Sequence, residues 1–329
     1  MVKFFYRENG KIYNAREYFK LNSDKYYQII IILKHYLEEY FDKKTEPTEI
    51  NFIMYPHLGD EIFEDDRIAA EMLEQGKDEL NEIRGVAICI RNDTDQNLIL
   101  RDGYRDLKLI YIGLAENYSL LINILSSLHE LNHLRNPFNS AVDYGIEFHG
   151  TTYKENKRKF IEYNVRNILN EYYANFRSYS YLKDLRANFS FDISDLNPIL
   201  TNSMYSLKKG AEKLKTNLIK LKNMEANYFR FHQYLQSIFY FYENFLKFLG
   251  KWDGMLQCGE NVDKFNGIYE YFKSIMKENA QETLIPLSNT IKEITNPALQ
   301  ETREIQKFYD LFMTIANEYP SILREMTEK

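Results

Sequence analysis

Two histidines and a glutamate lie together in the segment His129-Glu130-Leu131-Asn132-His133, and their types and spacing suit metal-dependent hydrolysis. Residues four apart lie on the same face of a helix, so His129 and His133 can direct two imidazole nitrogens at one point. Imidazole is a preferred ligand of zinc, and a catalytic zinc site keeps three protein ligands and one water. Glu130 follows the first histidine directly, which predicts a carboxylate beside that water in the role of general base.

The same pattern can arise by chance, because the chain has six histidines in 329 residues. Composition alone gives that chance as about one in a hundred. The motif lies in the apolar, uncharged stretch 122–134, where two histidines and a glutamate would otherwise be costly to bury. We therefore favour a metal site over a coincidence.

A catalytic zinc site needs a third donor beyond the two histidines. The metzincin pattern would continue with glycine and then histidine at positions that are Asn136 and Asn139 here, which excludes that class. Three residues of the following segment have suitable donor atoms and could reach back to the metal: Asp143, Glu147 and His149.

The strongest candidate for the third ligand is Glu171, in the segment Asn170-Glu171-Tyr172-Tyr173-Ala174-Asn175-Phe176. A carboxylate on a second helix is a usual way to complete a two-histidine zinc site. Asn175 lies four residues after Glu171 and is a candidate for a supporting hydrogen bond.

At these residues the chain resembles the gluzincin metallopeptidases, and most closely the ImmA/IrrE group. Members of that group have a His-Glu-x-x-His helix and, a few dozen residues later, a segment of the type Glu-x-x-Ala-Asn-Phe. The matching residues in this chain are His129, Glu130, His133, Glu171, Ala174, Asn175 and Phe176. The resemblance covers residues 45–185 and implies that a zinc ion (Zn2+) is bound by His129, His133 and Glu171, with Glu130 as the base.

The resemblance also implies a protein substrate, since members of the group act on particular proteins such as repressors in phage, mobile-element or stress responses. Peptide hydrolysis needs a second electrophile to stabilise the oxyanion. The candidates for that role are His149, Tyr163, Tyr172 and Tyr173. His149 is the one we name as catalytic together with Glu130, although a loop histidine with no role is the commoner case.

Composition and charge limit the other classes of function. Hydrophobic residues are 44% and charged residues 27% of the chain, as in ordinary globular proteins, and no apolar run is long enough to cross a membrane. The net charge of -6 makes nucleic acid an unlikely partner, and the lysine-rich face around Lys213 is the type that is usually solvated. With two distant cysteines and no signal peptide, the protein is expected to be cytoplasmic.

Periodicity predicts strands and helices before the motif and mostly helices after it. A hairpin is expected over 3–14 around Asn9-Gly10, with strands at 49–55, 86–91, 98–100 and 107–112 and helices at 24–43 and 66–80. The motif helix is expected to be capped by Asn117 or Ser119 and to stop at Pro137. The strand at 107–112 is expected at a sheet edge, as a shelf for a peptide substrate. Later helices are expected over 154–182, from Pro198, and over 207–224, 228–249, 268–276 and 299–319.

The expected fold class is therefore α+β. A zincin-like half, with a small twisted sheet and the active-site helix, would occupy residues 1–190, and a mostly helical half for substrate or partner recognition would occupy residues 191–329. The leading hypothesis is a zinc metallopeptidase that cleaves a specific intracellular protein. The alternative is an inactive protein of the same fold that binds a partner through its helical half.

Overall fold

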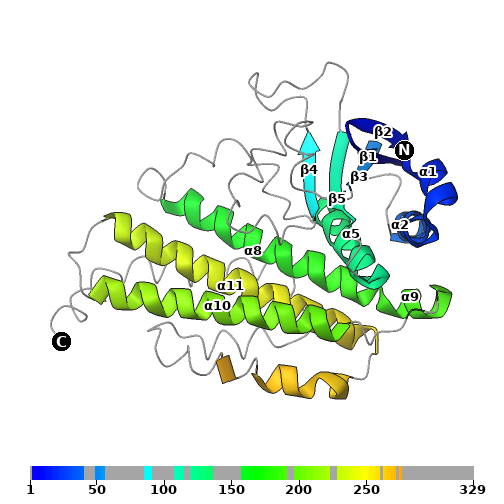
Figure 1. Cartoon of the computed structure of the whole chain (residues 1–329). Helices are drawn as coiled ribbons and strands as arrows, with labels where there is room; N and C mark the ends of the chain where they lie inside the picture. Colours follow the sequence, from blue (N-terminus) through cyan, green and yellow to red (C-terminus); the bar gives the residue numbers. More distant parts are fainter. Residues whose placement is uncertain are drawn as a thin grey trace. The chain divides into compact units, whose positions relative to one another are not determined.

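The computed structural model describes two compact units, Met1–Pro137 and Phe138–Lys329. The described residues are 2–40, 49–55, 85–90, 107–114, 119–135, 157–189, 191, 196–222, 228–259, 262–271 and 274–275. The first unit holds a five-stranded sheet with helices, and the described part of the second is helical (Figure 1). The predicted α+β class is confirmed. The division falls before the helix that carries Glu171, whereas the sequence analysis grouped residues 1–190 together.

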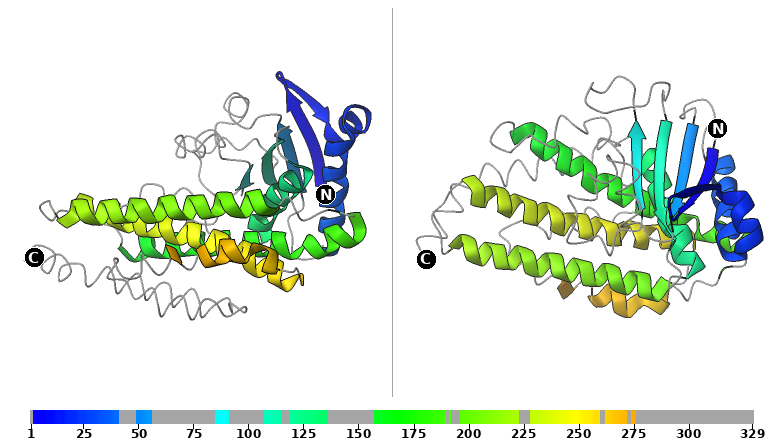
Figure 2. Two further views of the ribbon diagram at one scale, coloured as in Figure 1. Left: turned by 60° about the horizontal axis from the view of Figure 1, so that its bottom comes forward. Right: turned by 45° about the horizontal axis from the view of Figure 1, so that its top comes forward.

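The sheet of the first unit has the strand order β2-β1-β3-β5-β4 (Figure 2). Its strands are β1 (Val2–Glu8), β2 (Lys11–Asn14), β3 (Glu49–Tyr55), β4 (Gly85–Ile90) and β5 (Leu107–Gly113). The three central strands run parallel, and the outer strands β2 and β4 are antiparallel to their neighbours.

The expectation that the strand before the motif helix lies at the sheet edge is wrong. β5 pairs with β3 on one side, where Ile110 lies opposite Phe52, and with β4 on the other, where Tyr111 lies opposite Val86. The main-chain groups of β5 are therefore used within the sheet, and among the described strands β4 is the one at this edge.

The predicted N-terminal hairpin is confirmed. Asn9 and Gly10 both have positive φ values, 51° and 72°, which is the backbone of a type I′ turn. The turn sets a register in which Tyr6 lies opposite Tyr13, and the two rings are in contact.

Three helices complete the described part of the first unit. The sequence analysis did not predict α1 (Ala15–Asn22), although the Asn14 side chain caps it by accepting from the backbone N–H groups of Arg16 and Glu17. The predicted second helix is confirmed as α2 (Asp24–Tyr40). The motif helix is α5 (Leu120–Arg135), and Ser119 is its cap, because its hydroxyl accepts from the backbone N–H of Ile122.

The second unit contains α8 (Lys157–Ser180), α9 (Leu182–Phe189), α10 (Leu196–Lys222), α11 (Tyr228–Gln257) and the 3₁₀ helix η3 (Val262–Phe265). The two helices expected from Pro198 and over 207–224 are one helix, because a proline in the first turn lacks only an N–H that would have no helical partner. The elements expected at 66–80, 98–100 and 299–319 lie outside the described residues. None of the helices in the described part of the chain is long and apolar enough to cross a membrane.

Two glycines allow α11 to pack tightly against α8. A Cβ atom at Gly250 would overlap the backbone carbonyl oxygen of Tyr172, and one at Gly254 would lie 2.5 Å from that of Phe176. Because real Cβ atoms do not approach an oxygen so closely, only glycine fits at either position. The two glycines are one helical turn apart, so they form one contact stripe along α11.

Candidate metal centre

The buried apolar face of α5 fixes the position of the histidine pair. The helix buries Leu121, Ile124, Leu125, Leu128 and Leu131. His129 and His133 follow this face at its C-terminal end, and each remains partly accessible. Their rings meet edge to face, and the two Nε2 atoms lie 2.9 Å apart. The predicted convergence of two imidazole nitrogens is therefore present in the structure.

This arrangement fits a zinc ion. Two nitrogen ligands of a tetrahedral zinc ion lie about 3.3 Å apart, since each Zn–N bond is about 2.0–2.1 Å. The observed 2.9 Å separation requires only a small adjustment of the side chains. In both histidines the Nε2 atom is the nitrogen that faces the neighbouring ring, so Nε2 is the atom that would bind a metal.

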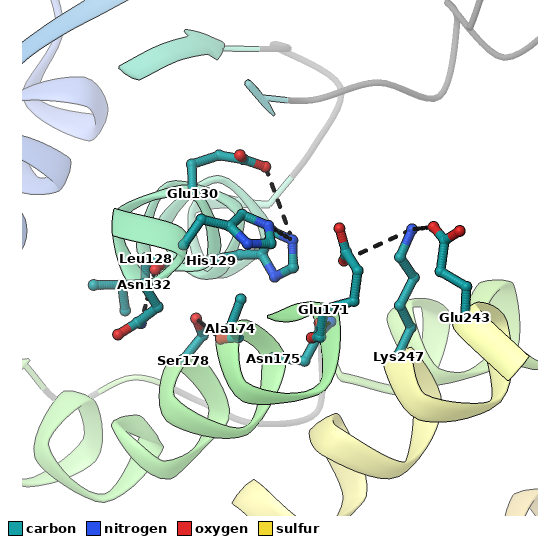
Figure 3. Close-up of polar contacts among 11 residues, drawn as sticks. Leu128, His129, Glu130, Asn132, Glu171, Ala174, Asn175, Ser178, Glu243 and Lys247 are labelled. Atoms are coloured by element: carbon teal, nitrogen blue, oxygen red, sulfur yellow. Dashed lines mark hydrogen bonds and ion pairs between the residues drawn. The ribbon is translucent and has the colours of Figure 1, made fainter. Parts of the chain in front are cut away.

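Glu130 places a nearly buried carboxylate beside this pair. The residue is only 8% exposed, and its Oε1 atom lies 4.0 Å from His129 Nε2 (Figure 3). Glu130 is therefore near the position where the histidine nitrogens converge, but on a different face of the helix from the histidines themselves. This is the arrangement that the sequence analysis expected for a base that does not bind the metal.

Asn132 connects the motif helix to α2. Its side chain is fully buried, its Oδ1 accepts a 2.7 Å hydrogen bond from the Tyr36 hydroxyl, and its Nδ2 donates to the Leu128 carbonyl. Both ends of the amide are therefore satisfied inside the unit. Because Asn132 directly precedes His133, this bond fixes the turn of α5 that carries the second histidine.

Glu171 lies on α8 within the helical unit, where its carboxylate meets a lysine of α11. Lys247 Nζ lies 3.7 Å from Glu171 Oε2 and 2.6 Å from Glu243 Oε1 (Figure 3). The supporting residue that we expected, Asn175, donates to the backbone carbonyl of Glu171 at 2.8 Å and not to its carboxylate. The approach of Lys247 to Glu171 could not be found from the sequence, because Glu171 is on another helix.

Tyr172 is excluded as the group that stabilises an oxyanion. Its hydroxyl is buried and donates a 2.8 Å hydrogen bond to Asp253 Oδ2 on α11. Burial raises the pKa of Asp253 to about 6, although the hydrogen bond from Tyr172 acts in the opposite direction. Burial and the adjacent Asp253 raise the pKa of Tyr172 far above its ordinary value. The Tyr172 hydroxyl is thus part of the α8–α11 contact.

The other candidates for the oxyanion role are less well placed or lie beyond the described side chains. Tyr173 is buried, contacts the Tyr172 ring edge to face and lies beneath the Arg177 guanidinium. His149 and the side chain of Tyr163 lie outside the described part of the structure, as do the alternative third ligands Asp143 and Glu147.

Among the described residues, His129 and His133 of the first unit and Glu171 of the second each offer one atom that could bind a metal ion. These are the three ligands that the sequence analysis named. A comparison of the chain with protein-family models, with curated proteins and with solved structures finds no match. Function is therefore inferred from the side chains themselves.

Proposed function

We propose that this chain is a zinc-dependent metallopeptidase of the gluzincin type. In this proposal His129, His133 and Glu171 bind the metal, and Glu130 is the general base. The observation that carries it is the pair of Nε2 atoms 2.9 Å apart on α5, with the carboxylate of Glu130 beside them. The resemblance of the motif segments to the ImmA/IrrE group supports a protein substrate.

The chain's own residues have separate roles in this reaction. A zinc ion, when bound, would polarise the scissile carbonyl and lower the pKa of a water toward neutrality. Glu130 accepts the proton of the attacking water and passes it to the leaving amine. Its low exposure keeps bulk water away from that proton, and its position on α5 keeps it in register with the histidines.

The edge strand β4 offers a place for an extended substrate. It is the outermost strand of the described sheet on the side of β5, which precedes the motif helix. A peptide can join such an edge through main-chain hydrogen bonds, which hold it extended without requiring a particular sequence. In this proposal the helical unit recognises the protein that is cleaved and supplies the specificity.

The first test is the metal content of the purified full chain. We expect about one zinc per wild-type chain and a large loss in Glu171→Ala and in His133→Ala, because removal of one ligand leaves an incomplete site. The control is Glu212→Ala, an exposed glutamate of α10, which should leave the metal content unchanged. A wild-type chain that binds no zinc after reconstitution would overturn the proposal.

The second test separates the enzyme from a binding protein. Glu130→Gln should keep zinc but lose turnover, because the amide cannot accept the water proton. The measurement is the set of new protein N-termini in cells that express wild type or Glu130→Gln. Cleavage products that depend on Glu130 support the peptidase. Full biological activity of the Gln variant would favour the partner-binding alternative.

A further inference from the structure

A line of three charged side chains joins α8 and α11 at the proposed third ligand. Lys247 lies between two carboxylates, with its Nζ atom 3.7 Å from Glu171 and 2.6 Å from Glu243 (Figure 3). Glu243 precedes Lys247 by four residues on α11, which is the favourable order for a Glu–Lys pair on a helix. Lys247 therefore has a fixed partner on its own helix and a second partner on α8.

Tight helix packing brings Lys247 to Glu171. Gly250 is three residues after Lys247, on the same side of α11, and it contacts the backbone carbonyl of Tyr172. Tyr172 directly follows Glu171, so the closest approach of the two backbones lies next to the carboxylate. The close packing at Gly250 and Gly254 thus fixes the distance between the backbones of α8 and α11 that the Lys247 side chain spans.

We propose that Lys247 is a positioning residue for the carboxylate of Glu171, and this inference rests on the proposed zinc site. The ammonium group attracts Oε2 of Glu171 and so orients the carboxylate, which leaves Oε1 directed away from the lysine as the metal-binding atom. Outer partners of metal ligands commonly act in this way, by fixing the orientation of the ligand before the metal binds.

The charges decide whether the lysine would help or hinder a cation. A lone ammonium group close to a metal ligand would repel zinc. Glu243 lies 2.6 Å from Lys247, so its negative charge offsets part of that repulsion. The three side chains together carry a net charge of about -1, which still favours a divalent cation. Orientation is therefore the dominant effect of Lys247.

The same ion pair contributes little to folding. The side chains of Lys247 and Glu171 are 35% and 22% exposed, and partly exposed pairs have small effects on stability. Loss of Lys247 should therefore change metal binding while the fold is retained. This difference makes a positioning role separable from a structural one.

The experiment compares zinc affinity in the full chain, measured by competition with a chromophoric chelator, for wild type, Lys247→Met and Lys247→Arg. We expect Lys247→Met to weaken zinc affinity about tenfold and to change the visible spectrum of the cobalt-substituted protein. Lys247→Arg should restore most of the affinity, because the guanidinium can hold the same oxygen. Circular dichroism verifies that each variant is folded.

The matched control is Lys208→Met, because Lys208 pairs with Glu212 four residues away on α10, at 4.0 Å. It should leave zinc affinity and the cobalt spectrum unchanged. If Lys247→Met binds zinc as tightly as wild type, with the same cobalt spectrum, the positioning role is overturned and the zinc site stands. If wild type binds neither zinc nor cobalt, the proposed function fails and this inference fails with it.

Discussion

Two buried tyrosine hydroxyls, one in each unit, hold helices that carry proposed metal ligands. In the first unit Tyr36 donates to Asn132, the residue before His133, at 2.7 Å. In the second unit Tyr172, the residue after Glu171, donates to Asp253 at 2.8 Å. The two contacts have nearly the same geometry, but the first acceptor is a neutral amide and the second is a carboxyl group.

The difference in acceptor makes one contact insensitive to pH and the other sensitive. An amide does not titrate, so the bond between Tyr36 and Asn132 keeps its strength across the physiological range. Burial raises the pKa of Asp253 to about 6, so its charge changes just below neutral pH. The hydrogen bond that holds α5, which carries the histidines, therefore does not depend on pH. The hydrogen bond that holds α8, which carries Glu171, has an acceptor that titrates.

The largest effect on stability is expected from replacing the amide acceptor of Tyr36 with a carboxylate, like the acceptor of Tyr172. Asn132→Asp would bury a carboxylate and replace the amide donor to the Leu128 carbonyl with an acceptor. We expect a loss of about 3–5 kcal/mol in the free energy of unfolding at pH 7.5, because the charge would be buried without a counter-ion. The measurement is urea unfolding. The exposed Asn202→Asp on α10 is the control and should change stability by less than about 0.5 kcal/mol.

The reciprocal change, Asp253→Asn, should remove the pH sensitivity of the second contact. Because the pKa of Asp253 is higher in the folded chain than in the unfolded chain, the folded state holds the proton more tightly between pH 4 and 6. The protonated carboxyl of Asp253 therefore stabilises the folded state at low pH, and this stabilisation is lost as the pH rises through about 6. The stability of wild type relative to Asp253→Asn should therefore fall by about 2 kcal/mol from pH 4 to pH 7.5.

Tyr172→Phe extends this test. The variant loses the hydrogen bond that lowers the pKa of Asp253, so its stability should fall more steeply with pH than that of wild type. Parallel pH profiles for wild type, Asp253→Asn and Tyr172→Phe would show that Asp253 does not titrate in this range.

A smaller effect on stability is expected from Gly250→Ala, which alters the distance between α8 and α11 that the Tyr172–Asp253 hydrogen bond requires. The added Cβ overlaps the Tyr172 carbonyl, so the helices must separate at a cost partly offset by the better helix propensity of alanine. We expect a net loss of about 1–2 kcal/mol in thermal unfolding. Gly210→Ala is the control, because the nearest atoms to a Cβ at Gly210 lie 3.6 Å away, which is an ordinary contact distance. This substitution should be neutral or stabilising. Equal effects at both glycines would contradict the role of the tight contact.

Local signals in the sequence were sufficient for several elements and for the histidine pair. The Asn9-Gly10 turn and the spacing of His129 and His133 each depend on residues within one or two turns of chain, as does the helix cap, which the sequence placed at Asn117 or Ser119 and the structure places at Ser119. The helix α1 also has a local signal, since Asn14 precedes Glu17 by three residues at its start. That pattern is a usual helix start.

Features that depend on distant partners could not be predicted in the same way. The interior position of β5 follows from its pairing with β3, which precedes it by a long stretch of chain, and alternation of residue types does not reveal neighbours in a sheet. Lys247 and Asp253 look like ordinary polar residues of a helix until α8 is placed against α11. The Gly250–Gly254 spacing was the available sign of that close contact.

The parallel pairing of β1, β3 and β5 has a consequence for the order in which the first unit folds. The hairpin of β1 and β2 closes over two residues. In contrast, residues 9–48 separate β1 from β3, and residues 56–106 separate β3 from β5. Closing such long loops costs chain entropy before any contact is gained, so these pairings form late. The motif helix α5 follows β5 and packs beside it. We therefore expect α5 to pack against the sheet near the end of folding, after the parallel strand pairs have formed.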